Sequence, residues 1–288
     1  SQKSAALISP AIINNERKKL SDRDMNALSS WDEYLQAVNS YVLMNSSKTT
    51  EEKLLHIYKS MEHGEKAIAL DPNHSSAFNL LAQAYNYLIF ESSAQDKRAE
   101  NDIKFREYTE KAFQLDPQNP DSIMNMGFIA FLDGDRNRFK DYVNKAFEVN
   151  PHHSRTLRAK GMNLVEDGKD FTAAIDAFTK AAEIDPLGEH YGQTVIFFCH
   201  LGNRDWENAN QSLDREMREN NHSRYFGFKA VVLAHQGKVE ESKEWLSKYQ
   251  KERPEIKNIE DYRTVAPSLN EQIKNLLIEG MKMAGLPE

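Results

Sequence analysis

The 288-residue sequence contains a single cysteine, Cys199. One cysteine excludes an internal disulfide and does not indicate the redox compartment. Because Cys199 lies in the apolar run VIFFCH, we expect a buried side chain rather than a reactive thiol.

Long apolar runs are also missing from the chain. No run approaches the ~18 apolar residues that a membrane-spanning helix needs, so we expect no membrane span. The sequence has no secretory signal and starts with SQKSAAL instead of methionine. We therefore expect a soluble fragment of a larger protein, and the sequence leaves open whether it is cytoplasmic or periplasmic.

The motifs of common catalytic and cofactor sites are absent. The 12 glycines form neither a GxGxxG nor a GxxxxGK[ST] phosphate-binding loop, and no GxSxG nucleophile elbow occurs. The nine histidines include no HExxH motif or similar ligand spacing. Basic residues are interspersed and the net charge is −7, which disfavours nucleic-acid binding. We expect no catalysis, no metal and no cofactor in this chain.

The few prolines and glycines that are present follow a regular period. Pro117, Pro151 and Pro186 are 34 and 35 residues apart. Each of these two intervals contains an apolar residue, a glycine four positions later and a second glycine seven positions after that. These residues are Ile123, Gly127 and Gly134 in the first interval, and Leu157, Gly161 and Gly168 in the second. A period of about 34 residues is typical of stacked helical hairpins.

The residues between these markers predict two amphipathic helices in each repeat, because apolar residues recur at helical spacing. Gly127 and Gly161 fall inside helices, where glycine costs about 1 kcal/mol relative to alanine. We expect another helix to cross closely at each of them. Gly134 and Gly168 supply turns, and each closing proline ends a helix. One hairpin cannot bury both apolar faces alone, so the hairpins must stack.

This pattern of apolar, glycine, alanine and proline positions resembles the tetratricopeptide repeat family. The resemblance implies an all-α fold, namely a right-handed superhelical solenoid of helical hairpins with a C-terminal capping helix. The predicted segments are 1–27, an N-terminal helix and linker; 28–72, a degenerate first hairpin; 73–117, a repeat with an inserted loop; 118–151 and 152–186, two regular repeats; 187–221, a degenerate repeat; 222–254, a regular repeat; and 255–288, a capping segment.

The two ends of the chain carry a second resemblance. The C-terminal sequence PSLNEQIKNLLIEGMKMAGLPE looks like that of bacterial signalling proteins in which a repeat array follows an adenylate cyclase or a winged-helix transcriptional regulator domain. The segment ISPAIINNERKKL resembles the linker that joins such a domain to the array. The resemblance implies a regulatory or sensory region whose effector domain precedes Ser1.

A repeat array without catalytic motifs favours a non-enzymatic scaffold with a protein or peptide partner. In the tetratricopeptide family the first helices line a concave groove with the second, fifth, sixth, ninth, twelfth and thirteenth positions of each repeat. Amides, rings and arginines at these positions suit an extended peptide, because they can bind its backbone, its apolar side chains and its carboxylates. The predicted groove residues are Asn79, Gln83, Asn86, Tyr87, Asn125, Phe128, Arg155, Arg158, Met162, His190, Gln193, Phe197, His200, Arg224, Phe228 and His235.

The same family also uses a carboxylate clamp of Lys, Asn and Arg around the end of a peptide. Asn125 and Arg155 match part of that pattern. Asn79 stands where the family has a lysine, and Ala159 replaces a basic residue. These departures disfavour recognition of a C-terminal carboxylate.

Self-association is an alternative function. The face formed by Trp31, Tyr34 and Tyr41, or the tail residues Leu277 and Met281, could pair two chains into a homodimer. Such pairing would bring two N-terminal effector domains together. A further alternative is a small-molecule sensor with a pocket between repeats, lined by aromatic and histidine side chains: Phe197, His200 and His235.

Overall fold

The structure is a computed structural model that describes residues 25–47, 49–185, 190–219, 222–266 and 270–288. Every regular element within these ranges is a helix, which confirms the all-α fold class. The chain divides into two compact units. Unit 1 comprises residues 1–157 and 183–188, and unit 2 comprises residues 158–182 and 189–288. Apart from the start of the first described helix at Met25, the segment predicted for residues 1–27 lies outside the described residues.

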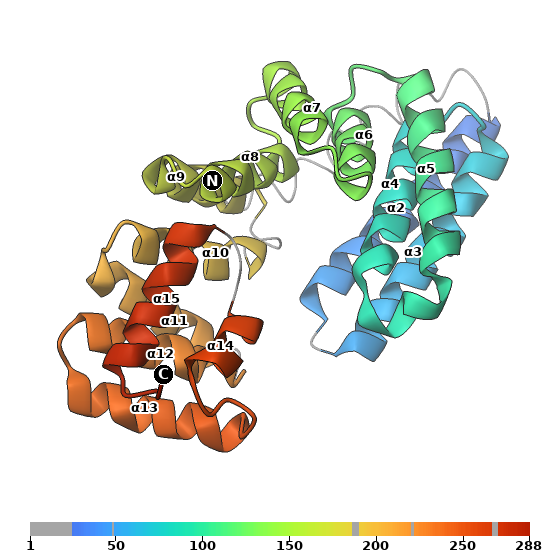
Figure 1. The fold of residues 1–288 in the computed structure, drawn as a ribbon. Helices are drawn as coiled ribbons and strands as arrows, with labels where there is room; N and C mark the ends of the chain where they lie inside the picture. Colours follow the sequence, from blue (N-terminus) through green and yellow to red (C-terminus); the bar gives the residue numbers. More distant parts are fainter. Residues whose placement is uncertain (1–24, 48, 186–189, 220–221, 267–269) are drawn as a thin grey trace. The chain divides into compact units, whose positions relative to one another are not determined.

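Unit 1 contains three helical hairpins in its described part (Figure 1). They are α2 (Met25–Ser46) with α3 (Thr50–Leu70), α4 (Ser75–Phe90) with α5 (Arg98–Leu115), and α6 (Pro120–Leu132) with α7 (Arg136–Val149). Each first helix packs along the second helix of its hairpin, and the hairpins contact one another through α3 with α4 and α5 with α6. The first helices also touch, α2 with α4 and α4 with α6. The predicted stacking of hairpins is therefore present in this unit.

Local sequence signals set the helix starts in unit 1. Thr49 forms a capping box before α3, in which its side chain accepts from the backbone N–H of Glu52 and its own N–H donates to the Glu52 carboxylate. The Asn119 side chain caps α6 directly before Pro120, which suits the first turn of a helix. These caps satisfy backbone groups that a helix leaves unpaired at its ends.

The core of unit 1 lies between the helices of each hairpin. Leu81 and Ile89 of α4 are buried in one cluster with Phe105 of α5. In the same cluster the Tyr85 ring stacks on Tyr108, with 5.6 Å between the ring centroids. The insertion expected as a loop in this repeat forms a 3-10 helix, Ser92–Lys97, that leads directly into α5.

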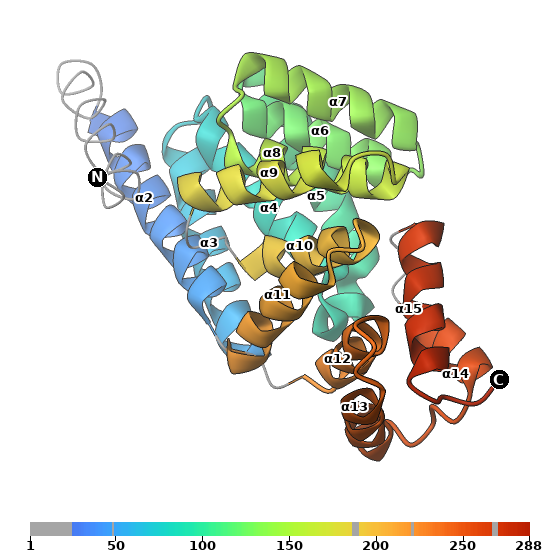
Figure 2. The same ribbon diagram turned by 90° about the vertical axis from the view of Figure 1, so that its left-hand side faces the viewer.

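Unit 2 contains the greater part of α8 (Ser154–Asp167) and α9 (Phe171–Ile184), followed by six further helices (Figure 2). These are α10 (His190–Gly202), α11 (Trp206–Glu219), α12 (Arg224–His235), α13 (Val239–Glu252), α14 (Ile259–Val265) and α15 (Glu271–Met283). Helix α10 packs along α11, α12 packs along α13, and α11 contacts α12. None of the helices described for this chain is both long and apolar enough to cross a membrane.

The mid-helix glycines lie at helix crossings, as predicted. An ideal Cβ on Gly161 would lie 2.7 Å from Cε2 of Phe178, and one on Gly127 would lie 3.0 Å from Cβ of Tyr142. Both distances are shorter than the ~3.5–4.0 Å of an ordinary carbon contact. Each of these glycines therefore lets the two helices of its hairpin approach closely.

The C-terminal segment contains two helices, α14 and α15, rather than one. Helix α15 packs against α10 and α12, and α14 packs against α15. Ile273, Leu277 and Met281 of α15 are fully buried in the main apolar cluster of unit 2. The capping helix implied by the tetratricopeptide resemblance is therefore present.

Candidate functional site

The first helices of unit 1 share a face that we name the inner face. It is the side of α2, α4 and α6 along which these first helices contact one another, and His153 and Arg155 at the start of α8 continue it by contacting Asp121. The side chains of the inner face that the argument uses are Gln83, Asn86 and Tyr87 of α4, Asp121 and Phe128 of α6, and Arg155 of α8.

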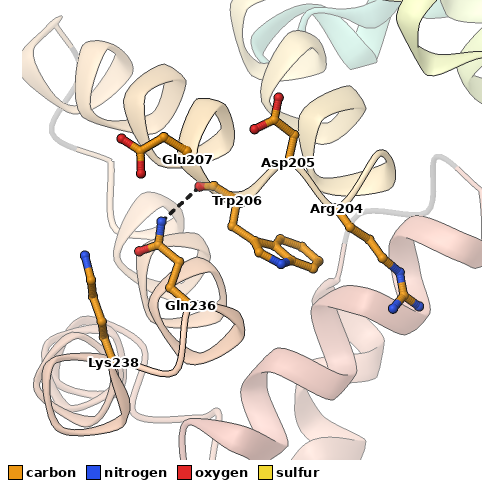
Figure 3. A pocket seen from close by; sticks show the side chains of 6 residues that line it. All are labelled: Arg204, Asp205, Trp206, Glu207, Gln236 and Lys238. Atoms are coloured by element: carbon orange, nitrogen blue, oxygen red, sulfur yellow. Dashed lines mark hydrogen bonds between the residues drawn. The ribbon is translucent and has the colours of Figure 1, made fainter.

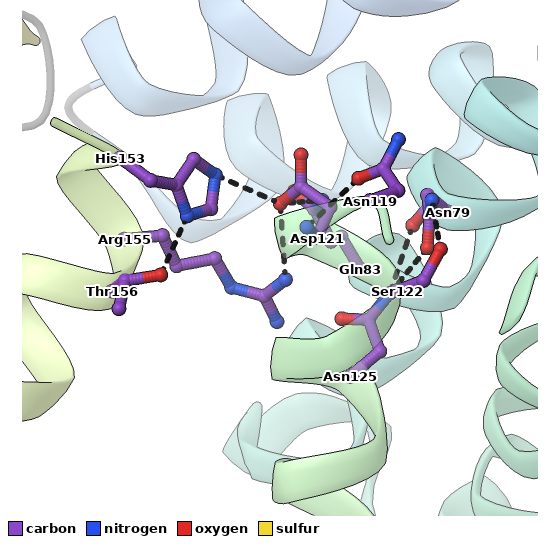
Figure 4. Close-up of polar contacts among 9 residues, drawn as sticks. All are labelled: Asn79, Gln83, Asn119, Asp121, Ser122, Asn125, His153, Arg155 and Thr156. Atoms are coloured by element: carbon purple, nitrogen blue, oxygen red, sulfur yellow. Dashed lines mark hydrogen bonds and ion pairs between the residues drawn. The ribbon is translucent and has the colours of Figure 1, made fainter. Parts of the chain in front are cut away.

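The carboxylate of Asp121, in the first turn of α6, lies at the centre of a cluster of polar contacts (Figure 4). Its Oδ1 accepts a hydrogen bond from Nε2 of Gln83 at 3.0 Å and one from the Arg155 guanidinium at 3.4 Å. Nε2 of His153 lies 3.4 Å from the same oxygen, while Nδ1 of His153 lies 2.7 Å from the Thr156 hydroxyl. Asp121 therefore joins α4, α6 and the start of α8, which come from three successive repeats.

These partners also fix the charge of Asp121. Burial by itself would raise the pKa of Asp121, but the hydrogen bond and charge of His153 and the charge of Arg155 outweigh it and hold that pKa at about 2. The Arg155 guanidinium also lies over the Phe128 ring, 4.9 Å from its centroid, which is a cation–π contact. The side chains of Asp121 and Arg155 remain 35% and 19% exposed. The face thus presents a fixed anion and a fixed cation beside an aromatic ring.

Two of the predicted groove residues lie below this surface instead of on it. Nδ2 of Asn79 donates to the Ser122 hydroxyl at 2.8 Å, and Nδ2 of Asn125 donates to Oδ1 of Asn79 at 3.2 Å. The exposed fractions of Asn79 and Asn125 are 3% and 0%. Their side chains face the neighbouring first helix, so they tie α4 to α6 and cannot reach a partner. Asn125 was also one of the two residues that matched a carboxylate clamp. Because it is buried, it cannot bind the carboxylate of a ligand.

The far end of α4 adds further polar groups to the inner face. Gln83, Asn86 and Tyr87 are all half-buried. The Tyr87 hydroxyl donates to the Glu91 carboxylate at 3.0 Å. Nδ2 of Asn86 has no hydrogen-bond partner among the residues that the structure describes. That nitrogen has almost no exposed surface, so the groups that this end of the face offers to a ligand are the Tyr87 hydroxyl and the Glu91 carboxylate.

The aromatic face proposed for self-association is partly packed. The centroid of the Trp31 ring lies 5.4 Å from that of the Tyr34 ring and 4.7 Å from that of the His74 ring. His74 is the residue directly before α4. Burial raises the pKa of Tyr34 to about 12 and lowers that of His74. Leu277 and Met281 are 0% exposed. Leu277 and Met281 therefore form no open apolar face, whereas Trp31, Tyr34 and Tyr41 are only half-buried.

In unit 2, several predicted groove side chains lie in the core. The Phe197 and Phe228 rings stack with 5.3 Å between their centroids and are 1% and 4% exposed, and Gln193 is 9% exposed. Nε2 of His235 donates to the backbone carbonyl of Leu276 in α15 at 2.9 Å. These side chains contact the chain's own helices because α15 packs on α10 and α12.

The remaining predicted residues of unit 2 are dispersed. Arg224 is exposed and donates to the Tyr225 hydroxyl at 3.1 Å. Nδ1 of His200 lies 3.5 Å from the Asp205 carboxylate, and burial lowers the pKa of His200. Arg158 and Met162 are half-buried. The side chain of His190 lies outside the described part of the structure.

A shallow pocket of about 450 Å³ occurs elsewhere in unit 2 (Figure 3). Its walls are Arg204, Asp205, Trp206, Glu207, Gln236 and Lys238, at the turns that precede α11 and α13. The pocket therefore has different walls from the Phe197, His200 and His235 pocket expected for a small-molecule sensor. Within the described ranges, no group of three or more His, Cys, Asp or Glu side chains could hold a metal ion.

Sequence reasoning missed Asp121, Ser122 and His153. The repeat period contains a signal for the first of them, because Asp121 lies 34 residues before Arg155 and therefore occupies the same position of the preceding repeat. Opposite charges at equivalent positions of stacked repeats meet across the stack. His153 and Ser122 have no comparable signal, since both are ordinary residues at a helix start.

Solved structures confirm the class of fold. The crystal structure of PilW, a type IV pilus biogenesis factor, aligns with a TM-score of 0.50 and 17% identity over 73% of this chain and 88% of PilW. The crystal structure of the APC/C hetero-tetramer Cut9–Hcn1 aligns with a TM-score of 0.53 and 12% identity over 93% of this chain, which spans 45% of that one. At these identities the likeness shows the fold alone, which is that of tetratricopeptide solenoid proteins.

The sequence comparisons cover less of the chain. The family described as regulator of microtubule dynamics protein 1-3 matches residues 24–131, which is less than half of the chain and lies within unit 1. No curated protein matches the sequence.

Proposed function

We propose that this chain is a non-catalytic scaffold that binds an extended segment of another protein on the inner face of unit 1. The observation that carries this proposal is the convergence of Gln83, Asp121 and Arg155, from three successive repeats, on one partly exposed polar cluster. A ligand that runs across the first helices would contact all three side chains together.

The chemistry of the face suits a peptide main chain. The half-buried Gln83 amide can pair with a main-chain group of the peptide, and Phe128 offers an apolar surface. Arg155 is held in place by Asp121 and by the Phe128 ring, so less side-chain entropy is lost when it binds a carboxylate of the ligand.

A regulatory role within a bacterial signalling protein is the more specific form of this proposal. It is supported by the resemblance of residues 267–288 to the C-terminus of signalling proteins with an upstream effector domain. The match of residues 24–131 to a family named for regulation is consistent with action through another protein. Reading the gene upstream of Ser1 tests it, and a gene without an effector domain there contradicts it.

The binding face can be tested with a peptide selected from a random display library against the full chain. Fluorescence anisotropy then gives its Kd for Arg155→Glu and for Lys145→Glu, a matched charge reversal at an exposed residue of α7. Because a hydrogen bond to a charged group contributes about 1.5–3 kcal/mol, Arg155→Glu should raise the Kd by about tenfold or more. Lys145→Glu should leave it unchanged.

The thermal midpoints of both variants verify that unit 1 remains folded. Gln83→Ala provides a second, uncharged change on the same face and should also weaken binding. If Arg155→Glu and Gln83→Ala bind the peptide as tightly as the unaltered chain, the inner face of unit 1 is not the binding surface. Failure to select any peptide above background counts equally against the proposal.

A further inference from the structure

Helix α15 lies along one stripe of α12. Gly227, Val231 and His235 are spaced four residues apart, so they share one side of that helix. An ideal Cβ on Gly227 would lie 3.0 Å from Cε of Met281, and one on Gly280 would lie 3.0 Å from Cα of Val231. Together with the hydrogen bond from His235 to Leu276, these contacts run the length of α12. His235 is a predicted groove residue, so the side of α12 expected to face a partner faces α15.

The N-cap residue and the first turn of α15 bind the carboxyl ends of two other first helices. The Asn270 side chain donates to the backbone carbonyl of Val165 in the last turn of α8. The Gln272 side chain donates to the carbonyl of Gly202, the last residue of α10, at 2.9 Å. The last carbonyls of a helix have no partner within it, so they can accept from other groups, and the Val165 carbonyl also accepts from the Gly168 N–H at 3.1 Å. Helix α15 therefore contacts the ends of all three first helices described for unit 2: α8, α10 and α12.

Apolar side chains and one glycine complete this contact. Ile273, Leu277 and Met281 recur at helical spacing and are 0% exposed. Gly280 lies beside Met281, and there a Cβ would come within 2.5 Å of Cγ1 of Val231. The sequence of α15 thus combines an apolar stripe with one small residue at the closest approach to α12. Glu279, directly before Gly280, is exposed.

From this geometry we infer that the first helices of unit 2 form a groove for an amphipathic helix, and that α15 is its ligand in cis. The partner class differs from the extended peptide proposed for unit 1, and the inference does not depend on that proposal. A helix with the same apolar stripe and small residue binds this groove in trans once α15 has left it. The tether gives α15 an effective concentration in the millimolar range, so it excludes weaker helices from the groove.

The test uses a fluorescein-labelled synthetic peptide with the native sequence 270–288 as the probe. In the full chain, Gly280→Val places two methyl groups against the Val231 backbone and should release α15 from the groove. Glu279→Val is the matched control, because it adds the same side chain one position earlier on the exposed side. The Gly280→Val chain should bind the probe at least about tenfold more tightly than the unaltered chain or the Glu279→Val chain do, a change equivalent to about 1.4 kcal/mol.

The same probe carrying Gly280→Val should not bind any of the three chains. If the Gly280→Val chain keeps its circular dichroism spectrum but binds the native probe no better than the Glu279→Val chain, the inference is overturned.

A second measurement applies if Gly280→Val unfolds unit 2. In the unaltered chain, the backbone amides of residues 274–283 should exchange with deuterium at least about tenfold faster than those of α12, because α15 leaves while the groove stays folded. Equal protection of α15 and α12 would show one cooperative core, and that result also overturns the inference.

Discussion

Replacement of Gly161 by alanine tests how closely α8 and α9 approach. Alanine inside a helix is favoured over glycine by about 1 kcal/mol, so propensity alone predicts a more stable protein. At this position, however, a Cβ would lie 2.7 Å from Cε2 and 3.0 Å from Cδ2 of Phe178. These distances are roughly 1 Å shorter than an ordinary carbon contact.

The Phe178 ring is enclosed on both sides by closely packed helices. Gly192 of α10 lies against its other edge, where an ideal Cβ would be 3.0 Å from Cδ1, and the side chain is only 3% exposed. Overpacking of a buried site costs roughly 1–3 kcal/mol. After the gain in helix propensity is subtracted, we expect Gly161→Ala to lower the free energy of unfolding by about 1 kcal/mol.

Urea denaturation followed by circular dichroism measures this change, and Phe178→Leu provides the second arm of a double-mutant cycle. Without the ring, the alanine should become stabilising by about 1 kcal/mol, which gives a coupling free energy of about 2 kcal/mol between the two positions. If Gly161→Ala has the same effect in both backgrounds, the close crossing at Gly161 does not exist.

The other predictions concern charge and burial. The buried Lys229 ammonium pairs with Asp214. Asp214→Asn leaves this ammonium without its counter-charge and should lower the free energy of unfolding, measured by urea denaturation, by about 1–3 kcal/mol, whereas Lys229→Met removes the charge and should lower it by less. A larger loss for Lys229→Met than for Asp214→Asn would contradict the pairing. Because the folded-state pKa of Asp121 is depressed to about 2, its contribution to stability is present above pH ~4 and is lost as the pH falls from there toward 2. Asp121→Asn should therefore flatten the dependence of Tm on pH between about pH 4 and 2. An unchanged slope would show that His153 and Arg155 do not stabilise the Asp121 carboxylate. Burial raises the pKa of Cys199 to about 12, so this thiol should react with Ellman's reagent at pH 8 only in the unfolded chain, and fast labelling of the folded protein would exclude the burial.

The sequence predicts the hairpins well because their spacing is set by packing. Gly127 and Gly161 were identified by period alone, and both lie where helices cross. The prediction weakens after Pro186, where the marker residues are incomplete. Gly202 follows the period as a turn residue, yet an ideal Cβ on it would lie 2.5 Å from Cε2 of the Phe171 ring. The residue at that turn with the left-handed φ, 57°, is Arg204. Which residue turns the chain depends on tertiary contacts that the period does not contain.

The candidate site was predicted only in part. The family positions identify the first helices correctly, but they do not say how deep each side chain lies. Asn79 and Asn125 occupy groove positions and yet pair with each other inside the stack. Asp121 was overlooked although it occupies the same repeat position as Arg155. The resemblance implied a C-terminal capping helix, but it did not indicate that α15 approaches α12 most closely at Gly280, where a Cβ would lie 2.5 Å from Cγ1 of Val231.

The most direct test of the central claim asks which face of unit 1 touches the ligand. A photoreactive benzoylphenylalanine is introduced at Tyr87 on the inner face or, as the control, at the exposed Glu110 of α5. Each chain is irradiated with the selected peptide, and the adduct is measured by mass spectrometry. The structure predicts crosslinking from position 87 and none from position 110. Crosslinking from position 110 alone would contradict the assignment of the inner face as the binding surface.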